Sequence, residues 1–164
     1  MPSNNIAAYY IRKLQMQPHP EGGYYKETYR SIEQILNTDG QERNISTAIY
    51  FLLEEEQKSH LHKIKSDELW FHHQGETLEI ISIQNGELIS TYLGSNLDAG
   101  EVLQTTIPAN TWFGSRVKNK KGFALVSCTV APGFDFEDFE MAKQEDLSKE
   151  FPHLKGRLEE MCLS

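Results

Sequence analysis

The chain has 164 residues, 38% of them hydrophobic, which is enough to bury one core of ordinary size, so we expect a single domain over residues 1–164. Its formal net charge of −8 excludes the basic surface that binds a phosphate backbone, and no nucleic-acid partner is expected. No apolar run approaches the roughly 20 residues that span a bilayer, and the N-terminus lacks the basic-then-apolar order of a signal peptide. These features predict a cytoplasmic protein without a membrane partner. Two cysteines alone suggest neither a disulfide framework nor a cysteine zinc site.

The first expected elements are a helix and a strand. Residues 3–16, "SNNIAAYYIRKLQM", have the apolar spacing of a short helix. Two prolines and a Gly-Gly pair then break the chain before the alternating segment "YYKETYRS". In an extended strand Tyr25, Glu27 and Tyr29 point to one face, while Arg30 points to the other.

From residue 45 onward the chain consists of short β-rich runs separated by turn residues. This spacing favours an antiparallel sandwich or barrel. Asn85-Gly86, flanked by apolar runs, is the strongest hairpin signal. The tail "QEDLSKEFPHLKGRLEEM" has helical spacing interrupted at Pro152 and is expected to cover the outside of the sheet. The β-rich runs are "ISTAIYFLL", "ELWFHHQG", "TLEIISIQ", "ELISTYLG", "EVLQTTIP", "TWFGSRV" and "FALVSCTVAP".

Four histidines and two acids gather in "SHLHKIKSDELWFHHQG". On a strand His60 and His62, two residues apart, face the same side. Glu68 shares a face with Trp70 on the next strand, so His60, His62 and Glu68 form a chelating set suited to zinc, iron, manganese or nickel. The alternative is that these histidines are ordinary hydrogen-bonded strand residues, which is what we expect of those at positions 72 and 73.

The same stretch resembles the first motif of the cupin superfamily, which runs His-x-His, a few residues, Glu, six residues, Gly. "GEVLQTTIPANTWFG" resembles the second motif, but Phe113 stands where metal-binding cupins carry their last histidine. A site of three protein ligands with an open position remains chemically sound. The resemblance therefore implies either that no cofactor is required or that one divalent transition metal is bound.

Five motifs in order resemble a smaller branch, the domain of unknown function 985 or cupin-5 family. They are "HPEGGYYKETYRS", "STAIYFLL", "SHLHKIKSDELWFHHQGETLEI", "IPANTWF" and "VAPGFDFEDFEMA". The likeness implies an all-β fold, a double-stranded β-helix or jelly-roll barrel with short terminal helices, assembled as a homodimer. It implies no settled reaction. The barrel is similar in shape to that of the dTDP-sugar 3,5-epimerases, which work without metal.

A jelly roll of this size can hold one small ligand among the inward faces of its strands. Aromatic walls with a few ionisable groups are how such pockets are commonly built. The segment with Phe134, Phe136 and Phe139 is interpreted as an edge or closing loop anchored by its rings. The expected lining and ligand-binding residues are Tyr25, Glu27, Tyr29, Arg30, His60, His62, Asp67, Glu68, Trp70, Trp112 and Phe113.

By analogy of fold, an epimerase needs a base, an acid on the opposite face and a group that stabilises the enolate. His60 or His62 suits the base, oriented by Asp67 or Glu68, and Tyr25 or Tyr29 suits the acid. The tyrosines fit a core or dimer-interface role equally well. Three functions remain open: an enzyme acting on a sugar-like or nucleotide-linked metabolite with or without metal, a non-catalytic small-molecule binder, and a structural or storage protein.

Overall fold

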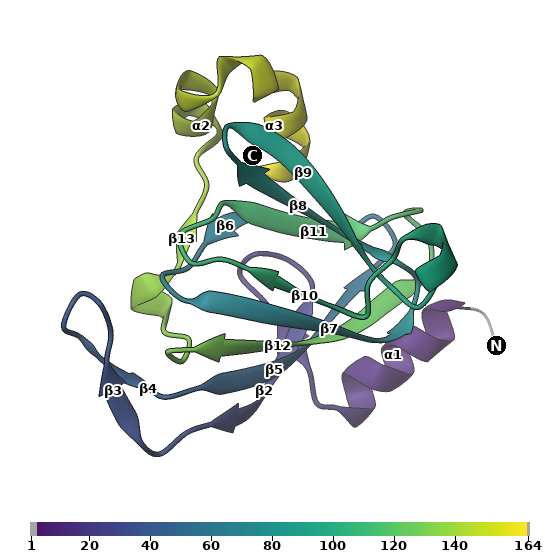
Figure 1. Ribbon diagram of the computed structural model, residues 1–164. Coiled ribbons are helices and arrows are strands. Elements are labelled where there is room, and N and C mark those ends of the chain that lie inside the picture. Colours follow the sequence, from purple (N-terminus) through teal and green to yellow (C-terminus); the bar gives the residue numbers. More distant parts are fainter. Residues whose placement is uncertain (1–2, 164) are drawn as a thin grey trace.

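The computed structural model describes residues 3–163, which form an antiparallel β-barrel with helices outside it (Figure 1). The helices are α1 (Ser3–Lys13), α2 (Gln144–Glu150) and α3 (Lys155–Met161), with short 3-10 turns η1 (Leu97–Ala99), η2 (Phe136–Asp138) and η3 (Pro152–Leu154). The strands are β1 (Gln17–Pro18), β2 (Tyr24–Arg30), β3 (Gln34–Leu36), β4 (Glu42–Asn44), β5 (Thr47–Glu54), β6 (Lys58–Lys63), β7 (Asp67–Gly75), β8 (Leu78–Gln84), β9 (Glu87–Leu93), β10 (Gln104–Ile107), β11 (Phe113–Val117), β12 (Phe123–Ala131) and β13 (Glu140–Met141). None of the helices within residues 3–163 is long and apolar enough to cross a membrane.

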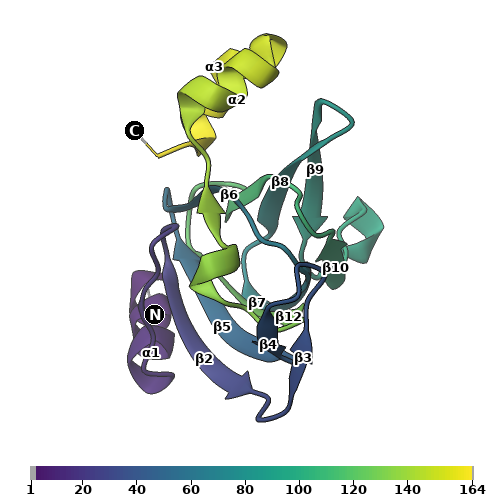
Figure 2. The same cartoon turned by 90° about the vertical axis from the view of Figure 1, so that its left-hand side faces the viewer.

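Two sheets face each other to make the barrel, which confirms the predicted jelly roll. The larger sheet has the order β1-β2-β5-β12-β7-β10 and the smaller one β13-β6-β11-β8-β9, while β3 and β4 form a separate hairpin. Figure 2 views the barrel end-on, with β2, β5 and β7 on one side and β6 and β8 on the other. Sequence-adjacent strands on opposite sheets, such as β5 and β6, show the alternation between sheets that a jelly roll requires.

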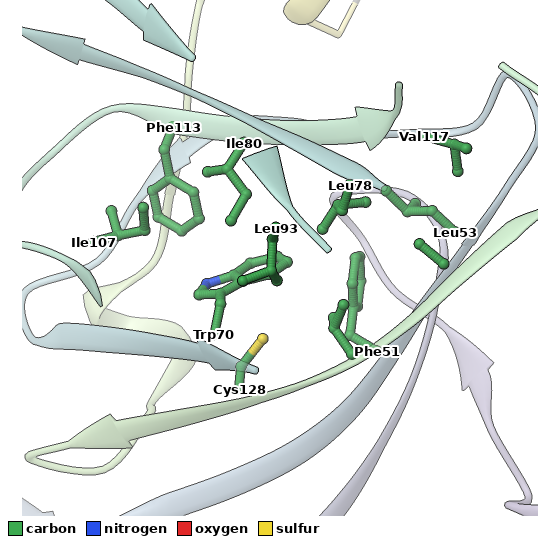
Figure 3. Packing of buried hydrophobic residues seen from close by; sticks show 12 residues of the cluster. Phe51, Leu53, Trp70, Leu78, Ile80, Leu93, Ile107, Phe113, Val117 and Cys128 are labelled. Carbon is green, nitrogen blue, oxygen red and sulfur yellow. The ribbon is translucent and has the colours of Figure 1, made fainter. Parts of the chain in front are cut away.

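The barrel interior is filled by apolar side chains from both sheets (Figure 3). Trp70 lies at its centre, with its ring centroid 5.7 Å from that of Phe51 and 6.1 Å from that of Phe113, both edge to face. Leu53 and Val117 close one end of this core. Inward residues follow the period of two that strands impose, so the packing fixes which side chains of β7 and β12 point inside.

Two further apolar clusters hold the helices on the outside of the barrel. Helix α1 packs against the outer face of β5 and β12 around Leu52 and Leu125. It ends at Lys13 rather than at residue 16, because Gln15 takes a positive φ of 54° that breaks the helix. Helices α2 and α3 cover Leu61 and outward-facing residues of β8, as expected of the tail.

The β8–β9 hairpin turns at Asn85-Gly86, as the sequence predicts. Gln84 pairs with Glu87, so the loop has two residues. Asn85 and Gly86 have φ values of 51° and 80°, the positive pair that a type I′ turn needs. This turn fixes the register of the two strands.

Candidate functional site

A cavity of about 420 Å³ lies inside the barrel, bounded by the larger sheet, β6 and the segment around η2. In Figure 2 the yellow-green segment with η2 lies at the barrel end that faces the viewer. The apolar and aromatic lining residues include Tyr25, Ile49, Phe51, Ile64, Trp70, Val130, Phe134, Phe136 and Phe139. The ionisable lining residues are His19, Glu21, Glu27, Arg30, His62, Glu68, Cys128 and Asp135.

Six of the residues expected at a pocket line this cavity: Tyr25, Glu27, Arg30, His62, Glu68 and Trp70. Five others do not line it: Tyr29, His60, Asp67, Trp112 and Phe113. Bulges in β2 and β6, and contacts made elsewhere in the fold, explain why these five residues do not line the cavity.

A bulge in β2 changes the predicted alternation. Glu27 pairs with Ile49 and Tyr29 with Ala48, so one extra residue sits on β2. Glu27 therefore keeps its inward direction, but Tyr29 turns out to solvent with 55% of its surface exposed. Arg30, expected on the opposite face, lines the cavity instead.

A second bulge lies in β6. Ser59 pairs with Ser115 and His62 with Phe113, so three steps on β6 match two on β11. This breaks the two-residue period that was to align His60 with His62. The His60 ring instead lies with Nδ1 2.8 Å from the carbonyl oxygen of Glu21.

The remaining three residues have structural contacts elsewhere. Asp67 is exposed and accepts a hydrogen bond of 2.8 Å from the Ala109 N–H. Trp112 packs with the cluster beneath the C-terminal helices, and the Lys63 ammonium lies 4.3 Å from its ring centroid. Phe113 is buried in the core, with its ring centroid 4.3 Å from that of His62.

The expected metal set of His60, His62 and Glu68 is not assembled. Nowhere in residues 3–163 do three His, Cys, Asp or Glu side chains come together in a group that could hold a metal ion. The β6 bulge separates the roles of the two histidines, and the Phe113 ring lies against His62 where a further ligand would stand. The described residues therefore do not fit the metal site that the first cupin motif implies.

His62 instead pairs with Glu21, a residue that the sequence did not indicate. Nδ1 of His62 lies 2.7 Å from the His60 carbonyl oxygen, which can only accept, so Nδ1 carries hydrogen. Nε2 lies 3.2 Å from Oε2 of Glu21 and has the lone pair of the neutral ring. A hydrogen bond there requires one proton to be held between the two groups.

Burial decides where this proton resides. It lowers the pKa of His62 to about 4, and it raises the pKa of Glu21 above its ordinary value. Both effects favour a protonated Glu21 that donates to a neutral His62. Oε1 of Glu21 accepts a hydrogen bond of 2.9 Å from the Ser59 hydroxyl, and Nδ1 of His19 lies 3.5 Å from Oε2.

Glu68 is the second buried carboxyl group of the cavity. Burial, reinforced by the neighbouring carboxyl group of Glu21, raises the pKa of Glu68 to about 8 against the opposing effects of Trp70 and Cys128. The Trp70 N–H favours the ionised form of Glu68, yet its nitrogen has no hydrogen-bond partner of ordinary geometry within residues 3–163. At pH 7 the cavity thus contains an uncharged carboxylic acid beside an unused N–H donor.

Sequence reasoning missed His19, Glu21, Cys128 and the cavity-lining role of the segment at residues 134–139. One signal for Glu21 was present in the Gly-Gly pair that follows it. Gly22 has a φ of 109°, and a Cβ there would lie 2.0 Å from the Lys58 carbonyl oxygen. The glycine allows the loop to approach β6 closely, and this approach carries Glu21 into the barrel.

Comparisons with known proteins point to one family. The family model described as Cupin superfamily (DUF985) matches residues 8–142. An uncharacterized protein of Saccharomyces cerevisiae is 33% identical over 160 residues, covering 89% of this chain and 78% of the yeast protein. A hypothetical protein from Leishmania major superimposes with a TM-score of 0.89 at 37% identity, covering 96% of this chain and 99% of that one. Protein SO0799 from Shewanella oneidensis gives a TM-score of 0.86 at 35% identity, covering 99% and 98%.

Proposed function

This chain belongs to the DUF985 family of the cupin superfamily, and we propose that it binds a small polar metabolite inside its barrel and moves a proton on it, as an epimerase or isomerase does. The observation that carries the proposal is Glu68, a carboxyl group that is 8% exposed and lines the cavity with a pKa of about 8. A general acid or base is most effective when its pKa lies near the working pH. Other cavity groups complete the set that proton transfer needs.

Tyr25 is the proposed acid. Its hydroxyl oxygen accepts a hydrogen bond of 3.0 Å from Nε2 of Gln17, which leaves the O–H hydrogen free to be donated. In the proposed step ionised Glu68 takes a proton from carbon next to a carbonyl group, so a C–H bond breaks and the Glu68 O–H bond forms. Tyr25 returns a proton to carbon, and exchange with water restores both side chains.

Two groups act on Glu68 in this scheme. The Trp70 N–H, which is buried and has no partner of ordinary geometry among the described residues, favours the ionised form of Glu68 that takes the proton. The Glu21–His62 pair holds its proton behind this site and shapes the charge that Glu68 experiences. His62 is then a positioning residue, because both of its ring nitrogens are already engaged.

The test is hydrogen exchange on candidate substrates in D2O, followed by proton NMR. Compounds with a carbonyl and neighbouring hydroxyl groups are first screened for thermal stabilisation of the protein. We expect at least one to exchange its carbon-bound hydrogen, and Glu68→Gln to slow the exchange roughly a hundredfold or more. Glu56→Gln, at an exposed position that does not line the cavity, is the matched control.

Binding without exchange in every compound would contradict the catalytic proposal and leave a non-catalytic small-molecule binder, the alternative function. We also propose that residues 1–164 form one domain, that the protein assembles as a homodimer, and that its location is cytoplasmic. The likeness to dTDP-sugar epimerases supports the reaction class through fold analogy alone, which is why the test must be chemical.

A further inference from the structure

The cavity has an excess of acidic groups. Glu21, Glu27, Glu68 and Asp135 line it, whereas Arg30 is the only Arg or Lys among its described lining residues. The Arg30 guanidinium already donates to Glu27 at 3.0 and 2.8 Å, and to Asn44 and the Phe134 carbonyl at 2.8 and 3.0 Å. A ligand anion would have to displace these bonds.

The cations nearest to the closing segment are also engaged. Arg43 makes a bidentate pair with Asp138, with N···O distances of 2.7 and 2.9 Å. Lys65 pairs with Asp39 at 2.6 Å, and Lys63 pairs with Glu140 at 3.1 Å. None of the three lines the cavity.

Aromatic rings surround the same space. Phe134, Phe136 and Phe139 pack edge to face, with centroid distances of 5.0, 6.1 and 6.0 Å. His19 extends this wall, and burial lowers its pKa so that its ring remains uncharged at neutral pH. Aromatic faces combined with carboxylates are the setting in which proteins hold ammonium groups.

We infer that the ligand of this cavity carries a protonated amine and no phosphate. The amine would lie against the phenylalanine wall with Asp135 as its countercharge, and Glu68 would become a second countercharge by releasing its proton to water when the amine binds. The inference relies on the proposed function only for the position of the ligand in the barrel.

A nucleotide sugar therefore does not suit the cavity. Its diphosphate would meet four carboxyl groups and one arginine that is already bonded to Glu27. Proteins recognise phosphate through free arginine forks, backbone N–H groups and helix N-termini. A small hydroxy-carbonyl compound that carries an amine suits the acidic groups of the cavity instead.

The test uses triads of small compounds in which an amine member and a phosphate member each differ from a hydroxyl member in one substituent, for example glucosamine and glucose 6-phosphate against glucose. The triads are extended to open-chain hydroxy-carbonyl compounds. Binding is followed by thermal shift and titration calorimetry on the whole chain. We expect the amine to bind about tenfold more tightly than the hydroxyl member, which corresponds to 1.4 kcal/mol, and the phosphate not to bind. Asp135→Asn and Glu68→Gln should each remove most of this preference, whereas Glu56→Gln should retain it.

Tighter binding of neutral or phosphorylated members, or no amine that binds in the whole panel, would overturn the inference. An amine that binds but does not exchange its carbon-bound hydrogen leaves the inference standing and contradicts the catalytic proposal. A neutral compound that binds in preference to its amine counterpart and exchanges its carbon-bound hydrogen supports the catalytic proposal and overturns the inference. Glu68→Gln is expected to fold because it imitates the uncharged acid.

Discussion

Replacing Glu68 by glutamine should stabilise the protein more at high pH than at low pH. The ordinary pKa of this carboxyl is 4.5, and in the folded protein it is about 8. Between these values the folded state holds a proton that the unfolded state has lost, so stability falls as the pH rises from 4.5 to 8. The glutamine variant lacks this titration.

The magnitude follows from linkage. The gap of about 3.5 between the two pKa values, at 1.36 kcal/mol per unit, gives an upper value of roughly 5 kcal/mol, of which roughly 4 kcal/mol develops between pH 5 and pH 8.5. The assay is urea unfolding of wild type, Glu68→Gln and the exposed control Glu56→Gln at half-unit steps over that range. The difference between variant and wild type isolates Glu68, because other titrating groups are common to both. A difference that does not change with pH would refute the buried, uncharged carboxyl.

The remaining predictions concern the partner histidine, the closing segment and the assembly. Burial lowers the pKa of His62 from 6.5 to about 4, so the free energy of unfolding of wild type should fall by about 3 kcal/mol relative to that of His62→Gln as the pH falls from 7 to 4. The same dependence of this free energy on pH in both proteins would contradict the prediction. Arg43→Ala leaves Asp138 buried without its partner and should cost about 3–5 kcal/mol in denaturant unfolding, whereas the exposed Arg157→Ala should cost little; equal costs would remove the ion pair as the cause. Light scattering of wild type should give twice the mass of one chain, and a mass of one chain would contradict the homodimer. Ile32→Asp, at a residue that is 97% exposed, tests whether the apolar surface near β3 lies in the dimer contact.

The sequence predicts the barrel well because its evidence is periodic. Regular alternation in the first half of β7 puts Glu68 and Trp70 on one face, and both line the cavity as expected. The turn at Asn85-Gly86 is equally local, since its positive φ angles depend on those two residues alone. Where one strand period runs without interruption, side-chain direction can be predicted from spacing.

The site is harder to predict because bulges and loops have no period. One extra residue in β2 exchanges Tyr29 for Arg30 at the cavity, and one in β6 removes His60 from the pair with His62. Glu21 comes from a loop whose path is set by its close approach to β6, a tertiary contact that spacing does not encode. The sequence therefore identifies the pocket but assigns wrong partners to His62.

The measurement that tests the central claim most directly is the rate of deuterium incorporation into a bound hydroxy-carbonyl compound between pH 6 and pH 9. If ionised Glu68 is the base, the rate in wild type should rise with pH through a midpoint near pH 8 and level off above it, and it should be lost in Glu68→Gln. A rate that is equal in wild type and Glu68→Gln at every pH would contradict the account.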